Sequence, residues 1–165
     1  MTILHQLAQA VAPWADFYNA SAVAQSAVNF GHFGGMMTAG GFALAADRAT
    51  LRAARAGTDQ ARQLHELAGI HPIVVGALGV TALSGLLLFA ADLESLVTLP
   101  AFWLKMSLVA LLLFNGYTML RAERSLEQGD PTDARGWRRL RRASIGSLVL
   151  WFAVVLAGSV LPNVG

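Results

Sequence analysis

The chain has 165 residues, of which 55% are hydrophobic and only 13% are charged. Soluble domains carry about 25% charged residues, so the composition argues against a soluble protein and for one that lies largely in lipid. The absence of cysteine excludes disulfide bonds and thiolate metal sites. The formal net charge is +2, but the arginines are confined to two segments, which indicates membrane topology and not nucleic-acid binding.

Residues 2–18 form the first predicted element. Apolar side chains recur there at spacings of three and four, as on one face of a helix. They are Leu4, Leu7, Val11, Trp14 and Tyr18. Aromatic rings cluster toward the end of the segment, which is typical of the headgroup region. We therefore expect an N-terminal amphipathic helix at the membrane interface, broken or kinked at Pro13.

Four apolar segments follow, at about residues 22–46, 68–91, 100–120 and 143–161. Each is long enough to cross a hydrocarbon layer of about 30 Å. Their short connections favour antiparallel neighbours. The sequence thus predicts an all-α fold, in which residues 1–165 form a single integral membrane domain with an antiparallel bundle of four transmembrane helices.

Local signals mark the expected ends of these helices. Ser21 is a candidate N-cap, and Gly57 is a candidate stop. Thr98 and Asp130 are candidate N-caps for the third and fourth apolar helices, with Pro131 as the first residue of the latter.

The arginines fix the expected orientation. All of them fall between the first and second apolar segments or between the third and fourth. They are Arg48, Arg52, Arg55 and Arg62, then Arg121, Arg124, Arg135, Arg138, Arg139, Arg141 and Arg142. The positive-inside rule places both Arg-rich loops in the cytoplasm and both termini in the periplasm. The preference for Arg over Lys suggests a GC-rich bacterial genome, so we expect the bacterial inner membrane.

A polar stripe runs along the first apolar helix. Gln25, Asn29, His32 and Met36 follow one another at spacings of four, three and four, which stacks them on one face. An ionisable group near mid-membrane is costly and is a functional hypothesis by default. His32 is therefore either a neutral imidazole hydrogen-bonded within the bundle, or a ligand to a metal or cofactor with Asn29 beside it.

Lys105, the single lysine, lies about one turn into the third apolar helix. It either extends its ammonium to the headgroups or pairs with an anion, namely Asp92 or a bound carboxylate. His71 lies about 15 Å from His32 in membrane depth, so the two histidines do not form a bis-histidine haem site.

Small residues and a basic patch indicate contact surfaces. Gly31 and Gly35 form a small-xxx-small motif, and Gly76 and Gly79 offer a second smooth surface for helix packing. A basic patch next to the fourth helix is expected to anchor the chain to anionic lipid or to a partner. It comprises Trp137, Arg138, Arg139, Arg141 and Arg142.

Three segments resemble small bacterial membrane proteins of the CopD-like and HemJ-like kind, over about half the chain. They are Gly31-His32-Phe33, then Ser84-Gly85-Leu86-Leu87-Leu88-Phe89, then Phe102-Trp103-Leu104-Lys105-Met106. The resemblance to the HemJ-like group implies porphyrin chemistry at His32 and Lys105.

Two classes of function follow. Smooth glycine surfaces and few reactive groups favour a non-catalytic accessory subunit that packs against a larger membrane assembly or a second copy. The alternative is a protein that binds haem b or another porphyrin through His32 and Lys105, or one involved in copper transport through His32, Met36 and Met37. The sequence predicts the lipid bilayer and other membrane proteins as partners, and offers no candidate catalytic residue.

Overall fold

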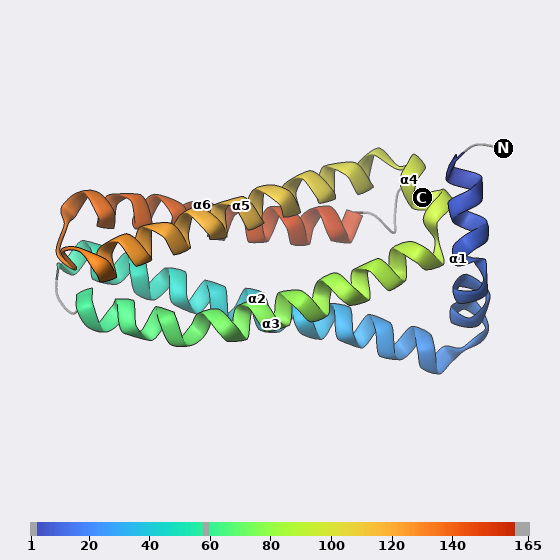
Figure 1. Cartoon of the computed structure of the whole chain (residues 1–165), viewed down its shortest axis with the longest axis horizontal. Helices are drawn as coiled ribbons and strands as arrows, with labels where there is room; N and C mark the ends of the chain where they lie inside the picture. The colour runs from blue at the N-terminus through green and yellow to red at the C-terminus, as the bar shows by residue number, and fades with distance from the viewer. Residues whose placement is uncertain (1–2, 58–59, 161–165) are drawn as a thin grey trace.

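The computed structural model describes residues 3–57 and 60–160, and within these ranges the chain is helical and contains no strand. The helices are α1 (Ile3–Ala20), α2 (Ala22–Ala56), α3 (Gln60–Ala91), α4 (Leu93–Thr98), α5 (Pro100–Gln128) and α6 (Ala134–Val160). Figure 1 shows α2, α3, α5 and α6 running side by side as a long bundle, with α1 across one end. The all-α expectation is therefore confirmed.

Three of the described helices, α3, α5 and α6, are long and apolar enough to cross a membrane. This supports a membrane protein. The 35-residue helix α2 is longer still but is not among the three. Its glycines and its polar residues Gln25, Asn29 and His32 lower its mean hydropathy. Residue 161, at the end of the fourth predicted span, lies outside the described residues.

Two predicted helix ends are confirmed. The hydroxyl of Ser21 accepts a hydrogen bond from the backbone N–H of Ala24 at 3.2 Å, which caps α2. Gly57 ends α2 with φ 67°, a left-handed conformation that glycine adopts without a Cβ penalty.

The other predicted caps need correction. Thr98 is the last residue of the short helix α4, and its hydroxyl donates to the carbonyl of Ser95, so it does not cap α5. Asp130 bonds to Thr132 within the turn, and Pro131 precedes α6. Asp133 is the true cap, because its carboxylate accepts from the N–H groups of Arg135 and Gly136, which also lowers its pKa.

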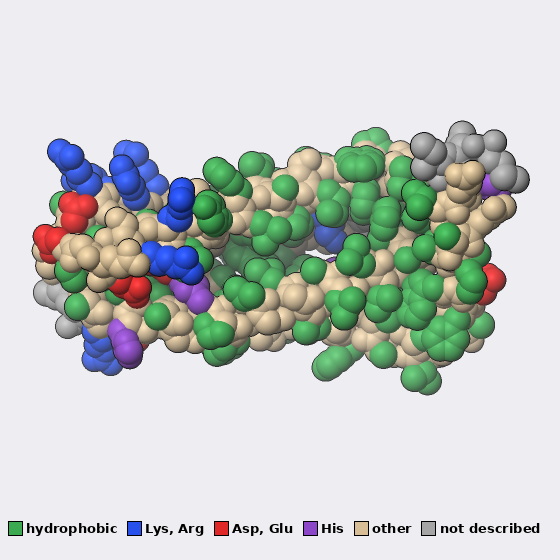
Figure 2. Space-filling view, viewed as in Figure 1, with side chains coloured by type: hydrophobic (Ala, Val, Ile, Leu, Met, Phe, Trp, Pro, Cys, Tyr) green, Lys and Arg blue, Asp and Glu red, His purple; other side chains and the backbone are tan. Residues whose placement is uncertain are grey.

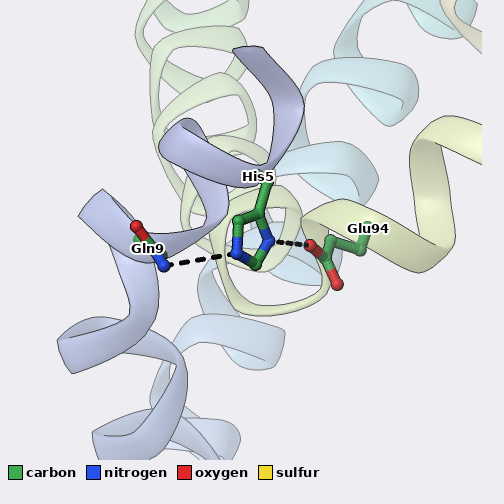
Figure 3. Close-up of polar contacts among 3 residues, drawn as sticks. All are labelled: His5, Gln9 and Glu94. Atoms are coloured by element: carbon green, nitrogen blue, oxygen red, sulfur yellow. Dashed lines mark hydrogen bonds and ion pairs between the residues drawn. The ribbon is translucent and has the colours of Figure 1, made fainter. Parts of the chain in front are cut away.

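Helix α1 continues through Pro13, contrary to the expected break. Pro13 lacks a backbone N–H, so one carbonyl in the preceding turn loses its helical donor. Because Pro13 is exposed, water can donate a hydrogen bond to that carbonyl instead. The indole of Trp14 donates to the carbonyl of Leu87 in α3 at 2.8 Å. Figure 3 shows His5 of α1 between Gln9 and Glu94, with its Nδ1 3.7 Å from the Glu94 carboxylate in α4. These contacts fix α1 across the end of the bundle.

The tightest packing lies at the opposite, Arg-rich end. There the last turns of α2 and α5 meet the first turns of α3 and α6. The buried apolar cluster comprises Ala46, Ala53, Leu64, Leu67, Met119, Leu126, Trp137, Leu140 and Ala143. Figure 2 shows most of the visible basic side chains gathered at the same end. Elsewhere large apolar side chains such as Phe30 and Met37 are about four-fifths exposed, at 80% and 78%, as lipid-facing residues are.

Helices α3 and α5 meet near their ends. Phe89 and Phe102 stack at the α1 end with ring centroids 5.3 Å apart. His71 and Glu123 join the two helices at the Arg-rich end, with Nε2 and Oε2 3.1 Å apart. Between these contacts Figure 2 shows a hollow with largely apolar walls, which we call the α3–α5 hollow.

Candidate functional site

His32 projects from α2 against α3. Its Nδ1 lies 3.1 Å from the carbonyl oxygen of Thr81 and 3.3 Å from the hydroxyl of Ser84. Because the Ser84 hydroxyl donates to the Val80 carbonyl at 2.7 Å, both neighbours of Nδ1 act as acceptors. Nδ1 therefore carries the proton of the neutral imidazole. Nε2 has no hydrogen bond to any residue within 3–57 and 60–160, and its lone pair is available to a ligand.

Gly85 makes room for the His32 ring. A Cβ built on Gly85 would lie 3.2 Å from Cε1 of His32, closer than most real side-chain contacts. A larger residue at this point of α3 would push the imidazole away from its backbone partner.

Lys105 projects from α5 toward α6. Its Cε and Nζ atoms lie 3.7 Å from the point where a Cβ on Gly158 would stand. Lys105 is also close enough to His32 for their charges to interact. In the part of the chain that the structure describes, no carboxylate forms an ion pair with Lys105, and Asp92 is exposed elsewhere.

Asn29 forms hydrogen bonds to α1 and within α2. Its amide donates to the hydroxyl of Tyr18 at 3.2 Å and to the carbonyl of Gln25 at 2.9 Å. Gln25 in turn donates to the carbonyls of Tyr18 and Asn19. The part of the polar stripe nearest α1 therefore holds α1 against α2. Met37 is 78% exposed, so it does not join His32 and Met36 at one place.

The three segments that carry the family resemblance meet in the half of the bundle nearest α1. His32 contacts Ser84 and lies against Gly85, and Phe89 stacks on Phe102. Lys105, three residues after Phe102, interacts with His32. The sequence could not reveal the contacts of His32, because they join residues about 50 or more positions apart.

The predicted packing glycines differ in their surroundings. A Cβ on Gly31 would make ordinary contacts with Val80 and Ser84, whereas a Cβ on Gly35 would stand 2.9 Å from the backbone oxygen of Ala77. These two glycines let α2 and α3 approach closely. Gly76 and Gly79 are exposed on α3 and have no described atom within 4 Å of an added Cβ.

The residues of the predicted basic anchor also differ in their exposure. Arg138, Arg139, Arg141 and Arg142 are exposed. Trp137 is only 3% exposed, and its indole donates to the carbonyl of Pro131 at 2.7 Å. This corrects the expectation for Trp137, whose ring packs in the buried cluster and is not available to lipid.

A second polar cluster was missed by the sequence analysis. At the Arg-rich end the structure brings together Asp47, His71, Glu123, Ser144 and Ser147. Asp47 directly follows the apolar run 22–46 and resembles the polar end of a membrane span. Asp47 is buried because α6 packs beside α2, and the sequence around Asp47 does not predict that packing.

No protein family, curated protein sequence or solved structure was found to match this chain. Its class rests on the features described above, an all-helical fold with membrane-spanning character. Its function rests on the two polar sites and the uncovered surfaces.

Proposed function

We propose that this protein is a non-catalytic subunit that packs against a larger assembly in the bacterial inner membrane. The proposed topology has spans in α2, α3, α5 and α6, both termini in the periplasm, α1 at the outer interface and the Arg-rich loops in the cytoplasm. The observation that carries the proposal is the α3–α5 hollow, whose apolar walls the described chain leaves uncovered in the middle of the bundle.

The exposed glycines of α3 support this proposal. Gly76 and Gly79 lie one turn apart on a surface that no described residue covers. Membrane helices associate through such small residues, because glycine lets two backbones approach closely and gain dispersion contacts. A transmembrane helix of a partner protein, laid along α3, would cover both glycines.

The experiment is to measure the size of the detergent-solubilised complex from the bacterial host by native electrophoresis and mass spectrometry. We expect the wild-type chain in a complex with other membrane proteins, and the double variant Gly76→Leu, Gly79→Leu released from it. Gly41→Leu is the matched control, because Gly41 is exposed on α2 and also has open space around it. A wild-type chain that runs alone, or only as copies of itself, would refute the subunit proposal.

A second candidate function is binding of haem b or another porphyrin, and the geometry of His32 favours it. A histidine that ligates a metal typically donates its other ring N–H to a carbonyl, as His32 does to Thr81. Lys105 has the charge to pair with a propionate carboxylate. His71 is held by Glu123 at the other end of the bundle, so His32 would be the single histidine ligand from the described chain.

Titration of the purified chain with haemin tests this candidate. We expect a Soret band that His32→Ala abolishes and Lys105→Met weakens. His5→Ala is the control, because His5 is exposed at the α1–α4 contact. An unchanged spectrum in His32→Ala would exclude this site.

A further inference from the structure

The polar cluster at the Arg-rich end receives residues from all four long helices. Asp47 comes from α2, His71 from α3, Glu123 from α5, and Ser144 and Ser147 from α6. Three of these residues are almost fully buried, with exposed fractions of 1% for Asp47, 3% for Glu123 and 0% for Ser144. The cluster lies beside the packed apolar core and apart from His32 and Lys105.

This cluster has more acceptors than donors. Both carboxylate oxygens of Asp47, Oε1 of Glu123 and the hydroxyl oxygen of Ser144 are buried without a hydrogen-bond partner among the described residues. The hydroxyls of Ser144 and Ser147 lie close enough to Asp47 to favour its charge, but neither makes a regular hydrogen bond to it. Buried ionised carboxylates without donors are strongly disfavoured. A proton on a carboxyl oxygen removes the charge and supplies a donor.

We propose that Asp47 and Glu123 form a buried proton-binding site at the Arg-rich end of the bundle, with His71 as its connection to solvent. In the protonated site the Asp47 carboxyl donates to a neighbouring oxygen, and the four helices pack around a neutral cluster. Loss of the proton leaves a buried negative charge that pushes these helices apart or draws in water.

The surrounding charges favour a proton over a metal ion. Within the described ranges no three His, Asp or Glu side chains are arranged to hold a metal. Glu127 of α5 repels Glu123 when both are ionised, and α6 contributes the hydroxyls of Ser144 and Ser147 beside Asp47. Arg124 and Glu127 of α5 act on His71 of α3. Asp47 and Glu123 also repel each other when both are ionised.

The position of Asp47 agrees with this role. Burial raises the pKa of its carboxyl from 3.8 to about 6, against the opposing effect of the two serine hydroxyls. A proton therefore stays on folded Asp47 at pH values where exposed aspartates have lost theirs.

His71 offers a route for exchange. Its side chain is 32% exposed, and its Nε2 lies 3.1 Å from Oε2 of Glu123. A proton taken up from water by the imidazole can pass from Nε2 to the Glu123 carboxylate, which returns the imidazole to its neutral form. The reverse transfer releases it.

Infrared difference spectroscopy of the full chain in lipid nanodiscs tests the proposal, because a protonated carboxyl group has a distinct carbonyl band. We expect the wild-type band to persist above pH 5 and to lose intensity through about pH 6. Asp47→Asn should remove this transition. Glu123→Gln should remove the separate contribution of its own carboxyl. Asp16→Asn is the matched control, because Asp16 is exposed in α1 and should leave the spectrum unchanged.

Two outcomes would overturn the proposal. One is a wild-type chain whose carboxyl band is already absent at pH 5, or whose transition survives in Asp47→Asn with normal helical circular dichroism. The other is a midpoint that moves with sodium concentration at constant ionic strength, which would assign a metal cation to the cluster. If Asp47→Asn does not fold, the same titration on Glu123→Gln decides, since Asp47 then titrates alone.

Discussion

The polar side chains at the two ends of the bundle differ in their hydrogen-bond partners. In the half nearest α1, polar groups bond to backbone carbonyls, as His32 does to Thr81, Trp14 to Leu87 and Gln25 to Tyr18. At the Arg-rich end, Asp47 and Glu123 are more deeply buried but keep unpaired oxygens. A backbone carbonyl can satisfy a donor and cannot satisfy a carboxylate. These hydrogen bonds to backbone carbonyls need no added proton, whereas the buried carboxylates at the Arg-rich end do.

The apolar packing also differs between the Arg-rich end and the middle of the bundle. The apolar core is continuous at the Arg-rich end, whereas α3 and α5 separate toward the middle and enclose the α3–α5 hollow. A dense core makes the burial of Asp47 possible, and an open middle leaves His32 and Lys105 accessible. The comparison predicts a pH-sensitive end and a ligand- or partner-sensitive middle, and the following changes test it in order of expected effect.

The largest effect is expected from pH acting on Asp47. Its pKa is about 6 in the folded chain and 3.8 in the unfolded chain, so the folded state holds the proton more tightly. The contribution of Asp47 to the free energy of unfolding should therefore be largest below pH 4, fall as pH rises through the interval to 6, and level off above it. This contribution amounts to about 3 kcal/mol at most. Burial raises the pKa of Glu123 from 4.5 to about 8, so Glu123 should extend the fall toward pH 8.

Reversible unfolding in mixed detergent micelles at several pH values measures this dependence. Asp47→Asn should make the fall between pH 4 and 6 shallower, leaving the part due to Glu123, and Asp16→Asn should not change it. A wild-type stability that rises over the same interval would contradict the burial of an unpaired Asp47.

A smaller effect is expected at the contact between α2 and α3. Gly35→Ala would place a Cβ 2.9 Å from the backbone oxygen of Ala77, so the two helices must move apart. Overpacking of this kind costs about 1–3 kcal/mol. Gly34→Ala is the matched control one residue away, because its Cβ meets no described atom within 4 Å. Equal unfolding free energies for the two variants would show that α2 and α3 are not so closely packed.

Local signals predicted much of the helical framework. Ser21 and Gly57 act through their own backbone neighbours, and their roles as cap and stop are readable from a short stretch of chain. Asp130 and Asp133 show the limit of such signals. Both can accept from nearby N–H groups, and the choice of Asp133 depends on where α6 begins in three dimensions.

The candidate sites were harder to predict, because their partners are distant in sequence. The depth of His32 marked it as unusual, but its bond to Thr81 spans 49 positions. Trp137 and Asp47 sit beside arginines, where exposure to headgroups or water is the natural expectation. Their burial follows from the packing of α6 against α2 and α5. The hydropathy of a single helix does not predict that packing.

A loss of about 1 kcal/mol is expected for Trp14→Phe, which keeps an aromatic ring but removes the donor to Leu87. The Leu87 carbonyl near the end of α3 would then lack this bond. The change should loosen α1 from the α3 end without altering the Arg-rich end. Hydrogen exchange should rise in α1 and stay constant at residues 60–67, and increased exchange at both ends would break the proposed independence of the two halves.

The smallest effect is expected for His5→Ala. The His5 and Glu94 side chains are 49% and 62% exposed, and their 3.7 Å contact lies in solvent or headgroups. Exposed ion pairs contribute at most about 1 kcal/mol, so the unfolding free energy should change by less than about 0.5 kcal/mol. A double-mutant cycle with Glu94→Ala measures the coupling. Because Trp14 and Asn29 hold α1 independently of His5, a coupling above 1 kcal/mol would mean that Glu94 and α4 contribute more to holding α1 than the half-buried indole does.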